Sequence, residues 1–147
     1  MAALLCRARD LLCALPLECL VETMRPLPTT SYPHLPEFVL GVVRVRGTQM
    51  PVVDLGALLG SRLPARPARF LSLRLEGRGV ILAVEGVVGL RQLEPGSRSN
   101  LPPLLSNANP DVVAGLGALD AELVLVLGTA RLVPSEAWSD LEIGGPA

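Results

Sequence analysis

The residues best suited to chemistry in this chain are its single histidine and its three cysteines, and their spacing argues against a catalytic or metal site. His34 lies in a proline-rich stretch, and no serine occupies the Gly-x-Ser-x-Gly turn that presents a hydrolase nucleophile. Cys6, Cys13 and Cys19 lack Cys-x-x-Cys spacing, and only one histidine could complete a metal set. We therefore expect buried free thiols and no metal.

Lysine is absent, because all thirteen basic residues are arginine. This absence excludes Schiff-base chemistry, attachment of pyridoxal phosphate and the lysine of phosphate-binding loops. The glycines before Ser61 and Asp120 match phosphate and dinucleotide fingerprints only in part. Asp120 and Glu122 flank a predicted turn and do not indicate a glycosidase pair. The sequence therefore excludes these classes of enzyme, and we expect no cofactor.

The composition predicts one folded domain with many short elements. The chain has 147 residues, of which 50% are hydrophobic and 18% charged, with fourteen glycines and fourteen prolines. Its apolar runs are strand-sized and shorter than the roughly 18 residues that a membrane helix needs. Arg7, Arg9 and Asp10 interrupt the first apolar stretch, which argues against a secretory signal. We expect a cytoplasmic protein with no membrane insertion.

Short apolar runs between turn-forming residues predict a mostly β fold. The hairpins expected are 4–7 with 11–15, 39–45 with 48–53, 69–75 with 79–84, and 112–119 with 122–127. A helical turn followed by a strand is expected over 18–24, and a further strand over 87–93. Asp54 is placed to cap one helical turn over 55–59. Loops are expected over 25–36, 61–68 and 94–110, and a last short helix over 136–141.

An internal repeat predicts two similar β units in this single domain of residues 1–147. Residues 39–59 match residues 113–133 without a gap, so that Gly41 falls on Gly115. Two small barrels of about five strands each, packed together and filled mainly by aliphatic side chains, satisfy this pattern. We expect the first barrel over roughly 3–60, the second over roughly 68–133, and a tail over 134–147.

Charge is distributed unevenly along the chain, although the net charge is only −1. Residues 1–78 hold ten arginines and six acids, whereas residues 79–147 hold three arginines and eight acids. Such asymmetry can orient association with a partner or with a second copy of the chain. Five arginines lie between 62 and 78, but they lack interleaved aromatic residues that would stack on bases. No nucleic-acid contact is expected.

The segment 41–60 carries an Arg-Gly turn followed by Pro-Val-Val-Asp-Leu. This pattern resembles the signature of the CheW-like chemotaxis adaptor family, and segments 14–26, 82–90 and 115–119 resemble further family segments in the same order. The resemblance implies two intertwined five-stranded SH3-like β-barrels with one or two short helices and no enzymatic activity. It also implies structural roles for Gly47, Pro51 and Asp54, which match the signature, and we expect a structural role for Gly41 as well.

The same resemblance implies a docking function. CheW-like proteins are adaptors that join the cytoplasmic tips of methyl-accepting chemoreceptors to a CheA-type histidine kinase, and other CheW-like proteins are further partners. In the family, the turn arginine and a strand glutamate contact the receptor, and here these are Arg46 and Glu22, with Arg44 and Leu20 beside them. An arginine at a hairpin turn presents a rigid fork of donors to carboxylates or carbonyls of a helical partner.

Three alternatives stay open. Arg44 and Val45 stand where the family usually has asparagine and leucine, which leaves room for a divergent, Frz-type accessory member that binds the receptor but not the kinase. A small-molecule-binding β-barrel module would need a closed apolar pocket. A nucleic-acid-binding barrel would use the arginines of residues 62–78 and would bind with a steep dependence on salt.

Overall fold

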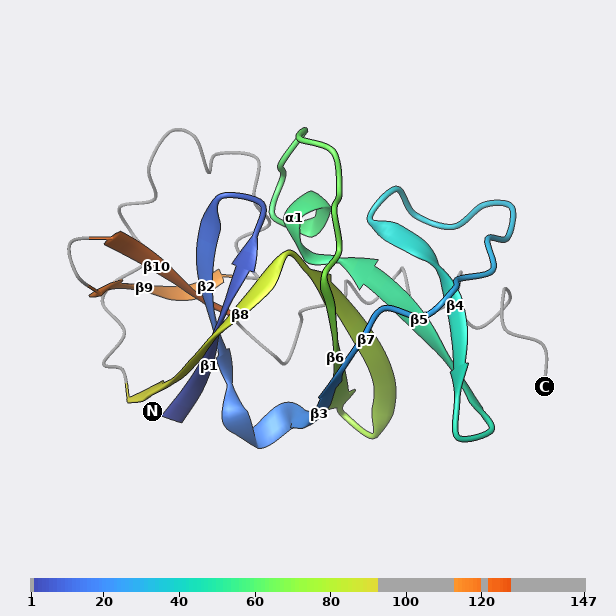
Figure 1. Cartoon of the computed structure of the whole chain (residues 1–147), viewed down its shortest axis with the longest axis horizontal. Coiled ribbons are helices and arrows are strands. Elements are labelled where there is room, and N and C mark those ends of the chain that lie inside the picture. Colours follow the sequence, from blue (N-terminus) through green and yellow to red (C-terminus); the bar gives the residue numbers. More distant parts are fainter. Residues whose placement is uncertain (1, 93–112, 120–121, 128–147) are drawn as a thin grey trace.

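The computed structural model describes residues 2–92, 113–119 and 122–127, which form two five-stranded β-barrels (Figure 1). Barrel A contains β1 (Ala2–Ala8), β2 (Leu11–Pro16), β8 (Gly86–Gln92), β9 (Val113–Leu119) and β10 (Glu122–Leu127), in the order β8-β1-β2-β10-β9. Barrel B contains β3 (Leu20–Met24), β4 (Val39–Val45), β5 (Thr48–Asp54), β6 (Arg69–Leu75) and β7 (Arg78–Val84), in the order β3-β6-β7-β5-β4. Two short helices, η1 (Leu17–Cys19) and α1 (Leu55–Leu58), complete the described part. The predicted mostly β class is confirmed.

Local elements agree with the sequence prediction. The helical turn and strand expected over 18–24 are η1 and β3, and the strand expected over 87–93 is β8. Asp54 caps α1, because its side chain accepts a hydrogen bond from the backbone N–H of Ala57. The turn between β9 and β10, the 94–110 loop and the 136–141 helix lie outside the described residues.

The predicted repeat is visible in the strand pairing. In barrel B, Val39 lies opposite Val53, and in barrel A, Val113 lies opposite Leu127, which is the same register moved along the chain by 74 residues (113 − 39). Both pairs of strands also contain a register shift at the same place. The two repeats therefore form equivalent hairpins in the two barrels.

The two barrels do not coincide with the two halves of the sequence. The hairpin β1–β2, expected in a barrel of residues 3–60, pairs with β8 and β10 in barrel A. The hairpin β6–β7, expected in a barrel of residues 68–133, lies between β3 and β5 in barrel B. Each half of the chain thus donates its first hairpin to the barrel of the other half. The stretch 60–68 therefore separates the two halves of the chain, and not the two barrels.

The central strands bury both of their faces, which joins the two barrels. On β7, Val80, Leu82 and Val84 belong to a hydrophobic cluster that includes residues of both barrels. Their neighbours Ile81 and Ala83 belong to a second cluster that contains only barrel B residues. Strands buried on both faces have nearly continuous apolar sequences, and this explains the run from 80 to 84.

The three cysteines are free and buried in the cluster shared by the barrels, as predicted. Burial raises the pKa of the Cys6 thiol to about 12 and that of Cys19 to about 11. Protonated thiols of this kind are poor nucleophiles and poor metal ligands at neutral pH. Within the described residues, no group of three histidine, cysteine or acidic side chains could hold a metal, and no helix is long and apolar enough to cross a bilayer.

Candidate functional site

The β4–β5 turn presents Arg46 at one end of barrel B. Arg46 and Gly47 have φ values of +49° and +81°, the pattern of a type I′ turn, whose twist matches that of the flanking strands. The Nη1 atom of Arg44 donates to the carbonyl oxygen of Gly47 at 2.9 Å and braces the turn. The backbone therefore holds the Arg46 side chain at the tip of the hairpin.

Arg46 and Glu22 form a two-pronged ion pair. The distances are 2.5 Å from Arg46 Nη1 to Glu22 Oε1 and 2.9 Å from Nη2 to Oε2. Glu22 lies on β3 and Arg46 follows β4, and these strands are the two outer strands of barrel B. The pair therefore links the two edges of the sheet. The Arg46 side chain is 73% exposed and that of Glu22 is 30% exposed, so a partner can reach both.

The other two predicted contact residues are placed differently. Arg44 is exposed on β4, whereas Leu20 is partly buried and packs against the cluster shared by the barrels. Its neighbour Val21, which the sequence interpretation did not single out, is 56% exposed. A register shift between Leu20 and Glu22 interrupts the pairing of β3 with β6 at this point. On β3, Val21 therefore exposes more apolar surface than Leu20 does.

The edge of barrel A also carries apolar side chains. Val87, Val88 and Leu90 are exposed on β8, the outer strand of its sheet. Alternation of apolar and polar residues along a strand is the usual signal for an exposed face, and the sequence Val-Val-Gly-Leu lacks that alternation. This explains why the sequence predicted a strand here but no exposed surface.

Gly41 has a structural role that the structure explains. Its φ is +151°, and an added Cβ would lie 2.7 Å from the carbonyl oxygen of Thr30. Thr30 exchanges two backbone hydrogen bonds of 2.9 Å with Val42, which fixes the loop before β4 against that strand. Pro51 lies within β5, opposite Val42. Glycine is thus required where the loop crosses β4.

Asp54 takes part in a buried ion cluster that the sequence did not predict. Arg9 Nη2 and Nη1 donate to the Asp54 carboxylate at 2.6 and 2.8 Å, and Nη1 also lies 3.1 Å from Glu85 Oε2. Glu85 also accepts from the backbone N–H of Arg9, and Arg9 Nε donates to the carbonyl oxygen of Leu63 at 2.9 Å. The Arg9 side chain is only 4% exposed. Hydrogen bonding to Asp54 raises the pKa of Arg9 above its ordinary value.

This cluster joins the two barrels. Arg9 lies in the β1–β2 turn of barrel A, Asp54 ends β5 of barrel B, and Glu85 lies between β7 and β8. An added Cβ at Gly56 would lie 2.6 Å from Arg9 Nη1, so this glycine leaves room for the guanidinium. The lone carboxylate of Asp54, ending an apolar strand in a chain without lysine, was the one signal for a buried arginine partner.

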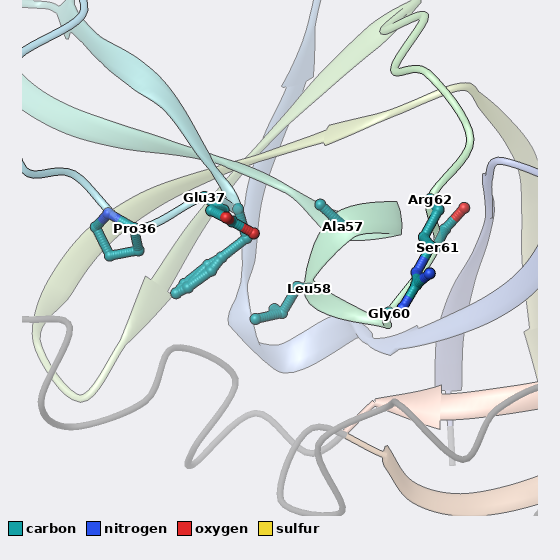
Figure 2. A pocket seen from close by; sticks show the side chains of 8 residues that line it. Pro36, Glu37, Ala57, Leu58, Gly60, Ser61 and Arg62 are labelled. Atoms are coloured by element: carbon teal, nitrogen blue, oxygen red, sulfur yellow. The ribbon is translucent and has the colours of Figure 1, made fainter.

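An open pocket lies beside α1, at the end of β5 that is remote from the β4–β5 turn (Figure 2). Its volume is about 560 Å³, and Phe38 and Leu58 supply apolar surface between the charged side chains of Glu37 and Arg62. The other lining residues are Pro36, Ala57, Gly60 and Ser61. The alternative function, a small-molecule-binding module, needs a closed apolar pocket, and this open pocket does not favour it.

Family comparison identifies the fold and the class of protein. The family model for the CheW-like domain matches residues 2–137. This chain belongs to the CheW-like domain family. The family consists of non-catalytic scaffold proteins of chemotaxis, in agreement with the prediction that the chain is not an enzyme.

Individual CheW proteins show the same similarity. The "Chemotaxis protein CheW" of Rhizobium meliloti (strain 1021) is 27% identical over 111 residues, which are 74% of this chain and 72% of that protein. The "Probable chemotaxis protein CheW" of Rhizobium etli is 29% identical over 103 residues, which are 68% of this chain and 66% of that protein. The crystal structure of the scaffolding protein TtCheW from Thermoanaerobacter tengcongensis has a TM-score of 0.76 and 20% identity, covering 92% of this chain and 94% of that one. This last comparison supports the twin-barrel fold.

The ion pair predicts a measurable shift in the titration of Glu22. Hydrogen bonding to Arg46 lowers the pKa of the Glu22 carboxyl below its ordinary value. Because the folded pKa is the lower one, the contribution of the pair to stability is present above the unfolded pKa and is lost as the pH falls through the folded pKa. We expect Arg46→Ala to raise the pKa of Glu22, as measured by NMR titration of its side-chain carboxyl. An unchanged titration in the variant would show that the pair does not persist in solution.

Proposed function

We propose that this chain is a non-catalytic adaptor of a cytoplasmic chemosensory pathway. It binds the cytoplasmic tips of methyl-accepting chemoreceptors and couples them to a CheA-type histidine kinase, with other CheW-like proteins as further partners. Receptor binding uses the surface formed by Glu22 and Arg46, which we call the pair surface, together with Arg44 and Val21. The observation that carries the proposal is the exposed, two-pronged ion pair at the β4–β5 turn.

The physics of the pair favours a role in binding. An ion pair this exposed adds little to stability, because water competes for both charges. Glu22 nevertheless holds the Arg46 guanidinium in one orientation, which reduces the entropy lost when a partner binds. A helical partner can then offer carboxylates or carbonyls to the guanidinium, while Val21 supplies exposed apolar surface that excludes water around the contact.

Reversing the charge of Arg46 tests the proposal. Arg46→Glu would place a second carboxylate beside Glu22, and we expect it to weaken binding to a purified receptor cytoplasmic hairpin at least about 30-fold. The melting temperature should change little, because the turn tip is exposed and buries little surface. Isothermal titration calorimetry measures the affinity, and circular dichroism measures the melting temperature.

Arg62→Glu is the matched control for this experiment. It makes the same change of charge at the pocket beside α1, away from the pair surface. We expect this variant to bind the receptor hairpin as the wild type does. Normal binding by Arg46→Glu, or equal weakening by both variants, would place the receptor contact elsewhere.

A second candidate is an accessory adaptor that binds the receptor but not the kinase. Arg44, exposed beside the turn, adds a positive charge where the family usually has asparagine. Parallel titrations with the receptor hairpin and with the kinase regulatory domain separate the two functions. Binding to both supports the coupling adaptor, and binding to the receptor alone supports the accessory one.

A further inference from the structure

The loop between α1 and β6 has few apolar contacts. None of its residues 61–68 is buried, and Leu63 is 55% exposed. We call this loop the strap. Segments with few buried apolar contacts open at a lower cost in free energy than core strands do. The position of the strap therefore depends on its hydrogen bonds.

Two side chains of the ion cluster hold the middle of the strap. Arg9 Nε donates to the carbonyl oxygen of Leu63 at 2.9 Å, and the backbone N–H of Arg66 donates to Glu85 Oε2 at 3.1 Å. In the part of the chain that the structure describes, no other hydrogen bond joins residues 62–67 to residues outside the strap. The middle of the strap is therefore held through the ion cluster.

The two ends of the strap are fixed without the ion cluster. The backbone N–H of Ser61 donates to the carbonyl oxygen of Gly56, and that of Ala68 donates to the carbonyl oxygen of Val84, each at 2.9 Å. Two prolines between these ends restrict the backbone, which lowers the entropy lost when the strap is held in one position. The middle of the strap can therefore separate from the protein while both ends stay in place.

Arg9 and Glu85 lie at the junction of the two barrels. Arg9 is in the β1–β2 turn of barrel A, and Glu85 lies between β7 of barrel B and β8 of barrel A. Glu85 also accepts hydrogen bonds from the backbone N–H and from Nη1 of Arg9, so barrel A positions this carboxylate. A change in the contact between the barrels therefore acts on both hydrogen bonds that hold the strap.

The strap also forms part of the pocket beside α1. Figure 2 shows Ser61 and Arg62 on one side of this pocket and Pro36 and Glu37 on the other. We propose that the strap is a movable side of the pocket, which the ion cluster at the junction of the barrels holds closed. When the strap opens, it withdraws Arg62 from the pocket. The proposal concerns this end of barrel B and does not rest on the receptor contact at the pair surface.

Limited digestion of the intact chain with trypsin tests this proposal. Every basic residue is an arginine, so trypsin cuts after arginine alone. Cleavage after Arg62 requires the strap to open, whereas cleavage after Arg74, within β6, requires barrel B to unfold. Mass spectrometry of the fragments gives both initial rates. In the wild type, cleavage after Arg62 should be at least about ten-fold faster than cleavage after Arg74.

A pair of substitutions at Arg66 tests the role of Glu85. Arg66→Pro removes the backbone N–H that donates to Glu85, whereas Arg66→Ala keeps it, and both remove the same side chain. The chain with Arg66→Pro should be cut after Arg62 about ten-fold faster than the chain with Arg66→Ala. In a Glu85→Ala background the two substitutions should give equal rates, because the acceptor is absent from both. Circular dichroism checks that each variant folds.

Three results would overturn the proposal. Cleavage after Arg62 that is no faster than cleavage after Arg74 in the wild type would show that the strap opens only when barrel B unfolds. Equal rates for Arg66→Pro and Arg66→Ala would show that Glu85 does not hold the strap. A faster rate for Arg66→Pro that persists in the Glu85→Ala background would come from the rigidity of proline and not from the lost hydrogen bond.

Discussion

Replacing Arg9 by alanine is expected to lower the free energy of unfolding by about 3–5 kcal/mol. The substitution removes the cation that Asp54 and Glu85 share, and leaves the Asp54 carboxylate, which is 7% exposed, without its ion partner in this cluster. Breaking a buried ion pair from one side costs far more than the pair contributes, because the remaining charge is neither solvated nor paired. Urea unfolding followed by circular dichroism measures the loss.

Asp10→Ala is the control for Arg9→Ala. Asp10 is exposed and lies in the same β1–β2 turn, so its replacement should change stability by less than about 0.5 kcal/mol. A loss below about 1 kcal/mol in Arg9→Ala would mean that the cluster is no more important than a surface ion pair. The contact between the two barrels would then be stabilised by their shared hydrophobic cluster and not by the ion cluster.

Replacing Gly41 by alanine is expected to lower the free energy of unfolding by about 2–4 kcal/mol, because two penalties act together. The φ of +151° is strained for any residue with a side chain, and the new Cβ would lie 2.7 Å from the carbonyl oxygen of Thr30. Relief of the clash requires the loop to separate from β4, which breaks the two hydrogen bonds between Thr30 and Val42. Urea unfolding again gives the magnitude.

Gly47→Ala separates these two penalties. Gly47 also has a positive φ, of +81°, but an added Cβ there meets no atom within 4 Å. We expect this variant to lose only about 1 kcal/mol, the cost of the left-handed conformation alone. Equal losses in the two variants would show that the contact with Thr30 is unimportant.

The sequence predicted the elements of this fold because their signals are local. The turn at Arg46 and Gly47, the cap at Asp54 and the proline-rich loop before Val39 each depend on a few adjacent residues. The internal repeat also predicted that two distant hairpins are equivalent, because their residues are related by a constant offset of 74 (113 − 39). Local chemistry and internal symmetry therefore predicted which segments are strands.

The exchange of hairpins between the barrels could not be predicted in this way. The pairing of β2 with β10 joins Cys13 to Leu125, residues far apart in the sequence. The exchanged hairpins, β1–β2 and β6–β7, have apolar residues on both faces. Their sequences therefore fit either barrel equally well. The choice depends on how the ten strands of the described residues pack, and no local pattern carries that information.

The candidate site was predicted only in part. Glu22 and Arg46 were chosen through the family resemblance, and the structure places their charged groups in contact. Arg9 and Glu85 were missed because they are 76 residues apart, and each is unremarkable in its own segment. Only the contact between Arg9 and Glu85 in the folded protein shows their role.

The most direct test of the central claim is an isothermal titration of the intact wild-type chain with a purified chemoreceptor cytoplasmic hairpin. We predict saturable binding that depends on the guanidinium at the β4–β5 turn. A wild-type chain that is fully folded, yet gives no complex with the hairpin at the highest soluble concentration, would contradict the claim.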